Sequence, residues 1–164
     1  MHSIGKANLD GSNATLIITG VINVRSIVVD NDDGRIYWTS NTRNVIESSD
    51  LEGGDMRTLV EFLGSPAPAG LVMHRNLLYI GHWVARSIQS VDKYTGGNLT
   101  TICSLSGQTR EIAIIDTGAN QYASDDNPCE GSGCSYLCVT ARDSYRCLCP
   151  ENAYLGSNKM TCSK

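Results

Sequence analysis

Residues Asp30-Asn31-Asp32-Asp33-Gly34-Arg35-Ile36-Tyr37-Trp38-Thr39-Ser40 set the architecture expected for this chain, because their pattern returns further along the sequence. The second copy is Leu77-Leu78-Tyr79-Ile80-Gly81, 42 residues after Arg35–Thr39. A stretch that returns at a fixed interval indicates an internal repeat, and a period of 20–50 residues is typical of solenoids, propellers or arrays.

Three further landmarks keep a similar interval on either side of this stretch. A Gly-containing turn occurs three times, a short pair of apolar or β-branched residues occurs three times, and a largely apolar run ending in Asp or His occurs with them. The sets are Leu9-Asp10-Gly11-Ser12, Leu51-Glu52-Gly53-Gly54 and Tyr94-Thr95-Gly96-Gly97; Ile17-Ile18, Leu59-Val60 and Thr101-Ile102; and Ser26–Asp30, Gly70–His74 and Glu111–Asp116. Independent landmarks with one period near 43 indicate about three repeats.

Each period contains four short segments with the composition of β-strands. In the most complete copy they are Ser26–Asp30, Arg35–Thr39, Val45–Ser49 and Thr58–Phe62, and one more strand is expected at Arg110–Asp116. They are rich in Ile, Val, Tyr, Trp and Thr, and turn residues separate them. Four strands in each ~40–45-residue period is the arithmetic of a β-propeller blade.

The motif Tyr37-Trp38-Thr39-Ser40 resembles the Tyr-Trp-Thr-Asp repeat of the low-density lipoprotein receptor family, and Tyr79-Ile80-Gly81-His82 is the matching set in the next copy. The resemblance implies an all-β chain: an incomplete six-bladed propeller in residues 1–124, with repeats at about 34–76 and 77–118, followed by a disulfide-rich module in residues 125–164. In the family the Asp of the motif ties blade to blade. Ser40 and His82 replace it, so we expect these blades to be held less firmly.

Six of the seven cysteines lie between Cys129 and Cys162, with the spacing C-x4-C-x3-C-x8-C-x-C-x12-C. Six cysteines allow 15 pairings. The spacing resembles an epidermal-growth-factor-like module, and this resemblance implies the pairs Cys129–Cys138, Cys134–Cys147 and Cys149–Cys162. So short a module has few apolar residues to bury, so cross-links that restrict the unfolded chain replace a core.

A metal site is the rival interpretation of the cysteine cluster. Zinc modules favour paired knuckles with two to four residues between cysteines. Cys147 and Cys149 are too close for such a pair, and the cluster contains no His. Calcium-binding modules of this kind carry a Glu or Gln close before the first cysteine, which Asp125-Asp126-Asn127-Pro128 lacks. We therefore expect neither metal nor cofactor.

Composition excludes several classes of protein. The chain of 164 residues has a net charge of −4, so no basic excess offers a footprint for nucleic acid. No motif of a hydrolase, metalloprotease or phosphate-binding enzyme occurs, and we expect no catalysis. The first residues contain no signal peptide and no apolar run is long enough to span a bilayer. A secreted-type module without a signal peptide suggests a fragment of a longer parent.

The family resemblance implies a function for that parent. The chain is expected to be an extracellular region that binds secreted protein ligands, in a lipoprotein-receptor-related protein that acts in endocytosis or signalling. Its parent would span the membrane once and present this region outside the cell. The alternative is a secreted or matrix protein of the nidogen or growth-factor-precursor type, which uses the same propeller. A membrane helix further along the parent would distinguish the two.

Some single residues are candidate sites. Two glycosylation sequons occur near turns, at Asn13 and Asn98. His82, beside Trp83, is either a pH-sensitive ligand contact or an ordinary exposed or hydrogen-bonded loop histidine. Cys103 is expected in an outer strand, either as a half-buried free thiol or in an intermolecular disulfide.

Two expectations concern the propeller as a whole. Arg25 and Arg110 stand near strand starts and are expected to face one end of it, although no role is assigned to them. Repeats bury their faces against neighbours, and three of six repeats would leave apolar faces open. The isolated chain is therefore expected to be unstable, to aggregate or to pair with a second copy.

Overall fold

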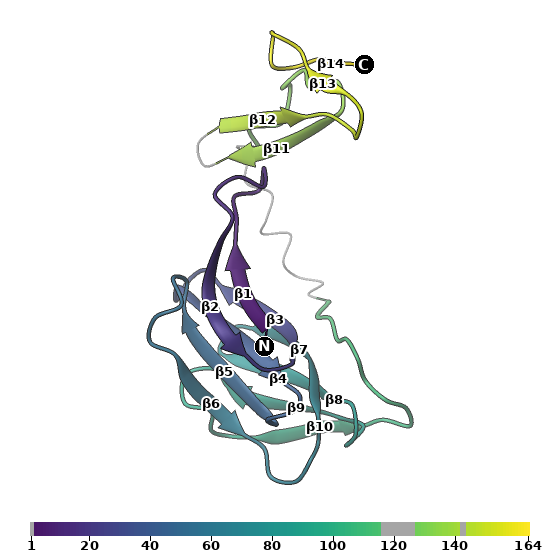
Figure 1. Cartoon of the computed structure of the whole chain (residues 1–164). Coiled ribbons are helices and arrows are strands. Elements are labelled where there is room, and N and C mark those ends of the chain that lie inside the picture. The colour runs from purple at the N-terminus through teal and green to yellow at the C-terminus, as the bar shows by residue number, and fades with distance from the viewer. Residues whose placement is uncertain (1, 116–126, 142–143) are drawn as a thin grey trace. The chain divides into compact units, whose positions relative to one another are not determined.

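A computed structural model describes residues 2–115, 127–141 and 144–164, and Figure 1 shows that this part of the chain is built from strands without a helix. The chain divides into two compact units: residues 1–4 with 16–115, and residues 5–15 with 116–164. The described strands are β1 (His2–Lys6), β2 (Thr15–Val21), β3 (Val24–Asp30), β4 (Arg35–Ser40), β5 (Val45–Asp50), β6 (Arg57–Glu61), β7 (Pro68–His74), β8 (Leu77–His82), β9 (Ser87–Asp92), β10 (Thr100–Ser104), β11 (Leu137–Ala141), β12 (Ser144–Leu148), β13 (Tyr154–Leu155) and β14 (Cys162–Ser163).

The first unit contains two four-stranded antiparallel sheets in sequence order, β3-β4-β5-β6 and β7-β8-β9-β10, which we call the first and second blades. Strands β1 and β2 pair as a separate two-stranded sheet. The four strands predicted for one period are confirmed, since they correspond to β3–β6 within two residues at each end. Each sequence repeat starts at the second strand of one blade and runs into the first strand of the next. The predicted end of the second repeat at residue 118 and the predicted domain boundary between residues 124 and 125 lie outside the described residues.

The strand predicted at Arg110–Asp116 is not formed where the structure describes it. Residues 110–115 have no strand hydrogen bonding, and Asp116 lies outside the described residues. The segment instead passes close to the second blade: a Cβ added to Gly70 would lie 2.9 Å from the backbone nitrogen of Ile112. A strand needs a ladder of backbone hydrogen bonds to a partner. The described residues supply none on this segment, although its sequence has strand composition.

Strand β4 is buried on both faces, and its alternating side chains join two cores. Ile36 and Trp38 pack with Ile4, Ile18 and Val21 of the β1–β2 sheet. Tyr37 points to the opposite face, into a cluster shared by the two blades. That cluster is Tyr37, Ile46, Val60, Phe62, Leu71, Leu78, Ile80 and Val91. Strand β4 therefore packs against a neighbouring sheet on each of its faces.

Hydroxyl groups of the first blade hydrogen-bond to the backbone of the second. Thr39 Oγ1 donates to the carbonyl oxygen of Ala69 at 2.9 Å. Ser26 Oγ accepts from the amide nitrogen of Leu71 at 3.2 Å and lies 3.4 Å from its carbonyl oxygen. Ser40, in the position of the family's Asp, donates to the carbonyl oxygen of Ile22 at 2.6 Å. The motif positions of this repeat thus connect adjacent segments of the fold.

The second blade has glycines at the two positions that Ser26 and Thr39 occupy in the first. At Gly81 an added Cβ would lie 2.6 Å from Thr109 Cγ2, and at Gly70 it would meet the backbone of residues 110–112. The absence of side chains therefore lets residues 109–112 approach this blade closely. The change from Trp-Thr to Ile80-Gly81 replaces a hydrogen-bonding side chain with room for a neighbouring segment.

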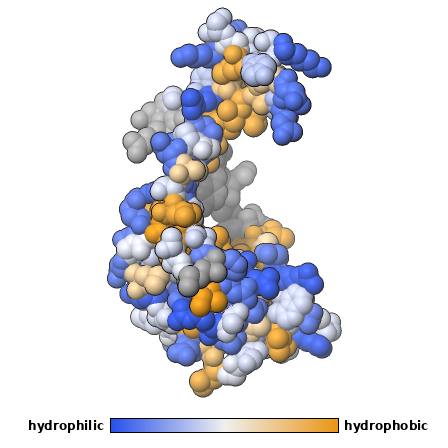
Figure 2. Space-filling model, in the orientation of Figure 1, coloured by the Kyte–Doolittle hydropathy of each residue, from blue (hydrophilic) through white to orange (hydrophobic). Residues whose placement is uncertain are grey.

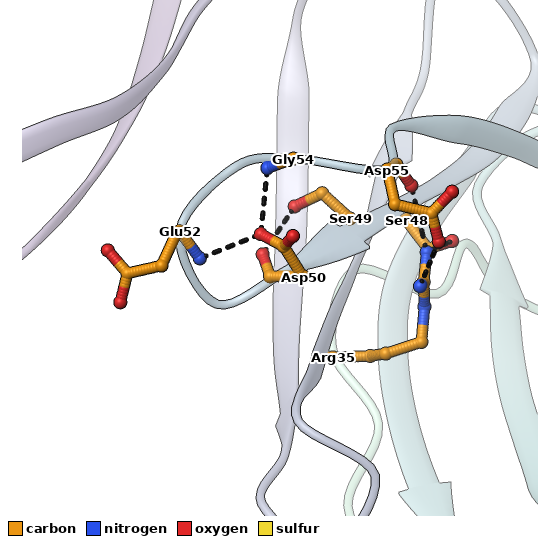
Figure 3. Close-up of polar contacts among 7 residues, drawn as sticks. All are labelled: Arg35, Ser48, Ser49, Asp50, Glu52, Gly54 and Asp55. Atoms are coloured by element: carbon orange, nitrogen blue, oxygen red, sulfur yellow. Dashed lines mark hydrogen bonds and ion pairs between the residues drawn. The ribbon is translucent and has the colours of Figure 1, made fainter.

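The repeated Gly-containing turns are shaped by a side-chain cap. Figure 3 shows the turn after β5, where Asp50 Oδ1 accepts from the amide nitrogens of Glu52 at 2.9 Å and Gly54 at 2.7 Å. Such Asx turns are a common use of Asp. In the same view Arg35 reaches Asp55, with 2.6 Å between Nη1 and Oδ2. Asp92 caps the corresponding turn of the second blade by accepting from the amide nitrogen of Thr95 at 2.9 Å.

One glycine in each of these turns touches the outer strand of the preceding sheet. A Cβ added to Gly53 would lie 2.1 Å from the carbonyl oxygen of Ile17, and one added to Gly96 would lie 2.0 Å from that of Leu59. Both glycines also have positive φ values, 86° and 69°. Two sequence landmarks, the Gly turn and the apolar pair, therefore recur together because they are the two sides of one contact.

The second unit contains the cysteine module. Its sheets are β11–β12 and β13–β14. The disulfides are Cys129–Cys138, Cys134–Cys147 and Cys149–Cys162, the pairs that the resemblance implies. The surface of this module has apolar residues among the polar ones (Figure 2). Leu137 and Leu155 are among its exposed apolar residues. Cys147 is buried, so the cross-links stand where a larger domain would have an apolar core. In the described part of the chain no helix is long and apolar enough to cross a membrane.

Candidate ligand-binding pocket

A pocket of about 530 Å³ opens at one end of the two blades, where β3 and β7 begin and β4 and β8 end. All of its lining residues belong to the first unit. They are Arg25, Asn41, Ala67, Ala69, Trp83, Val84, Arg110 and Glu111. The pocket therefore collects residues from five separated parts of the sequence, which meet because adjacent blades run in the same sense.

The loop that carries Trp83 is fixed by backbone hydrogen bonds. The amide nitrogen of Trp83 donates to the carbonyl oxygen of Ala67 at 2.9 Å, and that of Val84 donates to Pro66 at 3.1 Å. The amide of Arg86 then closes the turn onto His82 at 3.1 Å. A large aromatic residue held on a fixed loop loses little conformational freedom when something binds to it. Trp83 is half-buried, so part of its ring remains accessible.

Two arginines give the pocket its charge. The guanidinium carbon of Arg110 lies 4.4 Å from the centroid of the Trp83 ring, within the range of a cation–π contact. Arg25 is exposed near the start of β3 and has no ion pair among the described residues. Glu111 supplies one negative charge. Two guanidinium groups against one carboxylate favour an anionic group, and a guanidinium can bind a carboxylate through two hydrogen bonds.

His82 does not reach the surface of this pocket. Its side chain is fully buried, and its ring meets that of Phe62 edge to face with centroids 4.9 Å apart. Neither ring nitrogen has a hydrogen-bond partner among the described residues. Burial lowers the pKa of His82, and an interaction with Gln89 opposes this only in part. The expected surface contact and the exposed-loop interpretation are both corrected: β8 ends with His82 inside the junction between the blades.

Other candidate residues lie outside the pocket. Cys103 is free and exposed on β10, so the expectation of a half-buried thiol is wrong, while its place in an outer strand is confirmed. Asn13 is exposed in a turn before β2, and Asn98 is exposed in the irregular stretch before β10. No group of three or more His, Cys, Asp or Glu residues that could hold a metal ion occurs in the described part of the chain. The expectation that the chain binds no metal stays a prediction.

The sequence indicated part of this site. Arg25 and Arg110 were expected at one end of the propeller, and the structure places both in the pocket. Trp83 was considered only as the neighbour of His82. The structure places Trp83 in the pocket and buries His82 between the blades. Asn41, Ala67, Ala69, Val84 and Glu111 were not singled out. Asn41, Ala67, Ala69 and Val84 share a signal of position, since each stands near a strand end at the same end of the blades. Glu111 instead lies in the segment that forms no strand.

The fold and the site define a β-propeller-type protein with a disulfide-rich module and a pocket at one blade end. A solved structure of a luciferin-regenerating enzyme resembles the fold, with a TM-score of 0.59 and 14% identity over 68% of this chain and 39% of that one. At this identity the likeness concerns the fold alone. No family model matches the sequence.

Comparison with the sequences of known proteins shows more specific relatives. It is 28% identical over 160 residues to mouse low-density lipoprotein receptor-related protein 5, covering 98% of this chain. It is 32% identical over 127 residues to rat low-density lipoprotein receptor-related protein 4, covering 76% of this chain. The chain is homologous to these lipoprotein receptor-related proteins over most of its length. It spans 10% and 6% of their respective lengths.

Proposed function

We propose that this chain is an extracellular, non-enzymatic region that binds secreted protein ligands, as part of an endocytic or signalling co-receptor. The observation that carries the proposal is the pocket in which Arg110 stacks on Trp83. Trp and Arg are the residue types most enriched among those that dominate protein–protein binding energy. The pocket is about the size that an inserted side chain with its neighbours needs.

The charge of the pocket suggests the part of a ligand that enters it. Arg25 and Arg110 favour a carboxylate, and Trp83 with Val84 offers apolar contact beside it. We therefore propose that the ligand inserts an acidic residue next to an apolar one.

The disulfide module supports an extracellular location, because disulfides persist in oxidising compartments. The alternative is a secreted or matrix protein of the nidogen or growth-factor-precursor type. Both would use the same pocket, so the pocket does not choose between them. A transmembrane helix encoded downstream of this region in the transcript would favour the receptor.

A peptide selection tests ligand binding at the pocket. A phage-displayed library of random peptides would be selected on the immobilised chain, and the enriched peptides synthesised. We expect them to contain an acidic residue beside an apolar one. Titration followed by Trp fluorescence is expected to report binding at Trp83, because Trp38 is fully buried.

Variants determine whether the peptides occupy this site. Trp83→Ala and Arg110→Gln are each expected to weaken binding about tenfold or more, a loss of about 1.4 kcal/mol or above. Arg57→Gln, on the exposed outer strand β6, is the matched control and should leave affinity unchanged. Peptides that bind all of these variants equally, or a selection without enrichment, would contradict the proposal.

A further inference from the structure

The outer strands of the three sheets in the first unit differ in charge. These are β2, β6 and β10, the last strand of each sheet. An outer strand presents unpaired backbone groups to which another chain can add, and proteins blunt such edges with charged side chains. Strand β6 (RTLVE) has charges at Arg57 and Glu61, both exposed. Strands β2 (TLIITGV) and β10 (TTICS) have none.

Strand β10 is the more exposed of the two uncharged strands. Every residue from Thr100 to Ser104 is exposed, and Ile102 is 54% accessible. Strand β9 hydrogen-bonds one edge of β10, and no described strand pairs with the other edge. Exposed apolar and β-branched residues on an unpaired edge are the usual setting for intermolecular strand pairing. An edge of this kind is open to other chains unless another feature covers it.

The residue two positions before each outer strand differs between the charged strand and the two uncharged strands. Asn13, Asp55 and Asn98 occupy this equivalent place, with φ values of 54°, 44° and 56°. Asp55 precedes the charged strand β6 and is paired with Arg35. Asn13 and Asn98 precede the uncharged strands, and each begins an Asn-x-Thr sequon. Both asparagines are exposed, and no side-chain contact is described for either.

We propose that Asn13 and Asn98 carry N-linked glycans, which protect β2 and β10 from pairing with other chains. In the transfer, the amide nitrogen of Asn98 forms a bond to the anomeric carbon of an oligosaccharide held on a lipid pyrophosphate. The bond from that carbon to the phosphate oxygen breaks, the lipid pyrophosphate leaves, and the amide gives one proton to the medium. A bulky, hydrated glycan then stands at the start of the exposed edge.

A glycan on Asn98 leaves the proposed ligand pocket open. Trp83 follows β8, at the end of the second blade where β9 begins. Asn98 precedes β10, at the end where β9 stops. Because β9 runs the length of the blade, the two residues stand at opposite ends of it. The same chain can therefore be glycosylated at Asn98 and bind a ligand in the pocket.

Cell-free translation with microsomes tests glycan addition, using the full chain behind an added signal sequence. This forces entry into the secretory compartment, so a negative result concerns the glycans and not the proposed extracellular function. We expect two steps in gel mobility that endoglycosidase H removes. Asn13→Gln and Asn98→Gln should each remove one step. Thr100→Ala should act like Asn98→Gln, whereas Thr100→Ser keeps the sequon and the glycan. A chain without the Asn98-dependent step overturns the proposal.

Protection of the edge requires a second measurement on chain secreted from cultured cells. Light scattering and non-reducing gels would compare wild type, Asn98→Gln and Thr100→Ser. We expect Asn98→Gln to form more associated species, with some linked through the exposed Cys103, and Thr100→Ser to behave as wild type. Adding Cys103→Ser should remove the covalent dimers while leaving the association. Equal association of glycosylated and unglycosylated chains would overturn the protective role, as would secreted chain in which Asn98 is unmodified.

Discussion

The ammonium nitrogen of Lys93, in the turn after β9, lies 2.5 Å from a carboxylate oxygen of Asp30 at the end of β3. This ion pair connects the second blade to the first, and Asp33 adds a second carboxylate at 2.7 Å. The side chains of Lys93 and Asp30 are 5% and 1% exposed. Burial alone lowers the pKa of Lys93, but hydrogen bonds from its ammonium to Asp30 and Asp33 outweigh burial and raise it.

We predict that Lys93→Met destabilises the chain by about 3–5 kcal/mol, because it leaves Asp30 buried without a counter-charge. Urea denaturation would measure the free energy of unfolding. Lys164→Met, at the exposed C-terminus, is the control and should change stability by less than about 0.5 kcal/mol. The double variant Lys93→Met with Asp30→Asn should recover part of the loss. A loss below about 1 kcal/mol for Lys93→Met would show that the pair does not hold the blades together.

Gly96→Ala is predicted to be far more damaging than Gly34→Ala. Both glycines have positive φ values, 69° and 63°, so each substitution costs about 1–2 kcal/mol of backbone strain. A Cβ at Gly96 also meets the carbonyl oxygen of Leu59 at 2.0 Å, whereas a Cβ at Gly34 meets nothing within 4 Å. Thermal unfolding should therefore show a modest loss for Gly34→Ala and a much larger one for Gly96→Ala. Equal losses would mean that the turn does not pack against β6.

His82 is predicted to make stability fall in acid. Its folded pKa lies below the ordinary value of 6.5, so protonation favours the unfolded chain. No such penalty exists above pH 6.5; below it, stability falls by at most about 1.4 kcal/mol per pH unit until the folded pKa is reached. His82→Gln should remove this part of the pH dependence, measured as urea midpoints between about pH 7.5 and 5. His74→Gln is the matched control and should keep it. An unchanged profile in His82→Gln would exclude this role.

The open face of the first blade is predicted to cause self-association. Ile27 and Val29 of β3 are 45% and 46% exposed, while Leu71, the repeat equivalent of Ile27 in the second blade, is 4% exposed. The difference arises because β3 and β4 pack against β7 of the second blade, whereas the sheet before the first blade has just β1 and β2 in the described chain. Light scattering should detect dimers or larger species, which Ile27→Thr with Val29→Thr should reduce. A stable wild-type monomer would contradict this.

The strand order could be predicted because turn chemistry and apolar alternation are local properties. Asp50 and Asp92 cap equivalent turns, and the glycines after them recur at the same interval. The disulfide pairs were available through resemblance to a known module, since spacing alone leaves fifteen choices. Arg25 and Arg110 were expected at one end of the propeller because each stands near the start of a predicted strand. Both line the pocket, although the strand predicted at Arg110 is not formed.

Other features depend on contacts that no single repeat contains. His82 and Ser40 hold the same motif position, yet Ser40 donates to Ile22 while His82 lies buried against Phe62 without a hydrogen-bond partner among the described residues. Residues 110–115 have strand composition but form no strand, because pairing needs a neighbour. Cys103 is exposed because its strand is the last of its sheet in the described chain.

The amino-acid pattern alone indicates the four-strand repeat and its turns, since each arises from residues close together in sequence, whereas the disulfide pairs are implied by resemblance to a known module. Tertiary packing specifies which repeat surfaces are covered, which motif side chains find partners and which residues meet in the pocket. The physical reason is that burial and hydrogen bonding between blades depend on the neighbour, not on the repeat itself. Thr39 bonds to Ala69, 30 residues away, and Lys93 to Asp30, 63 residues away, because adjacent blades stack.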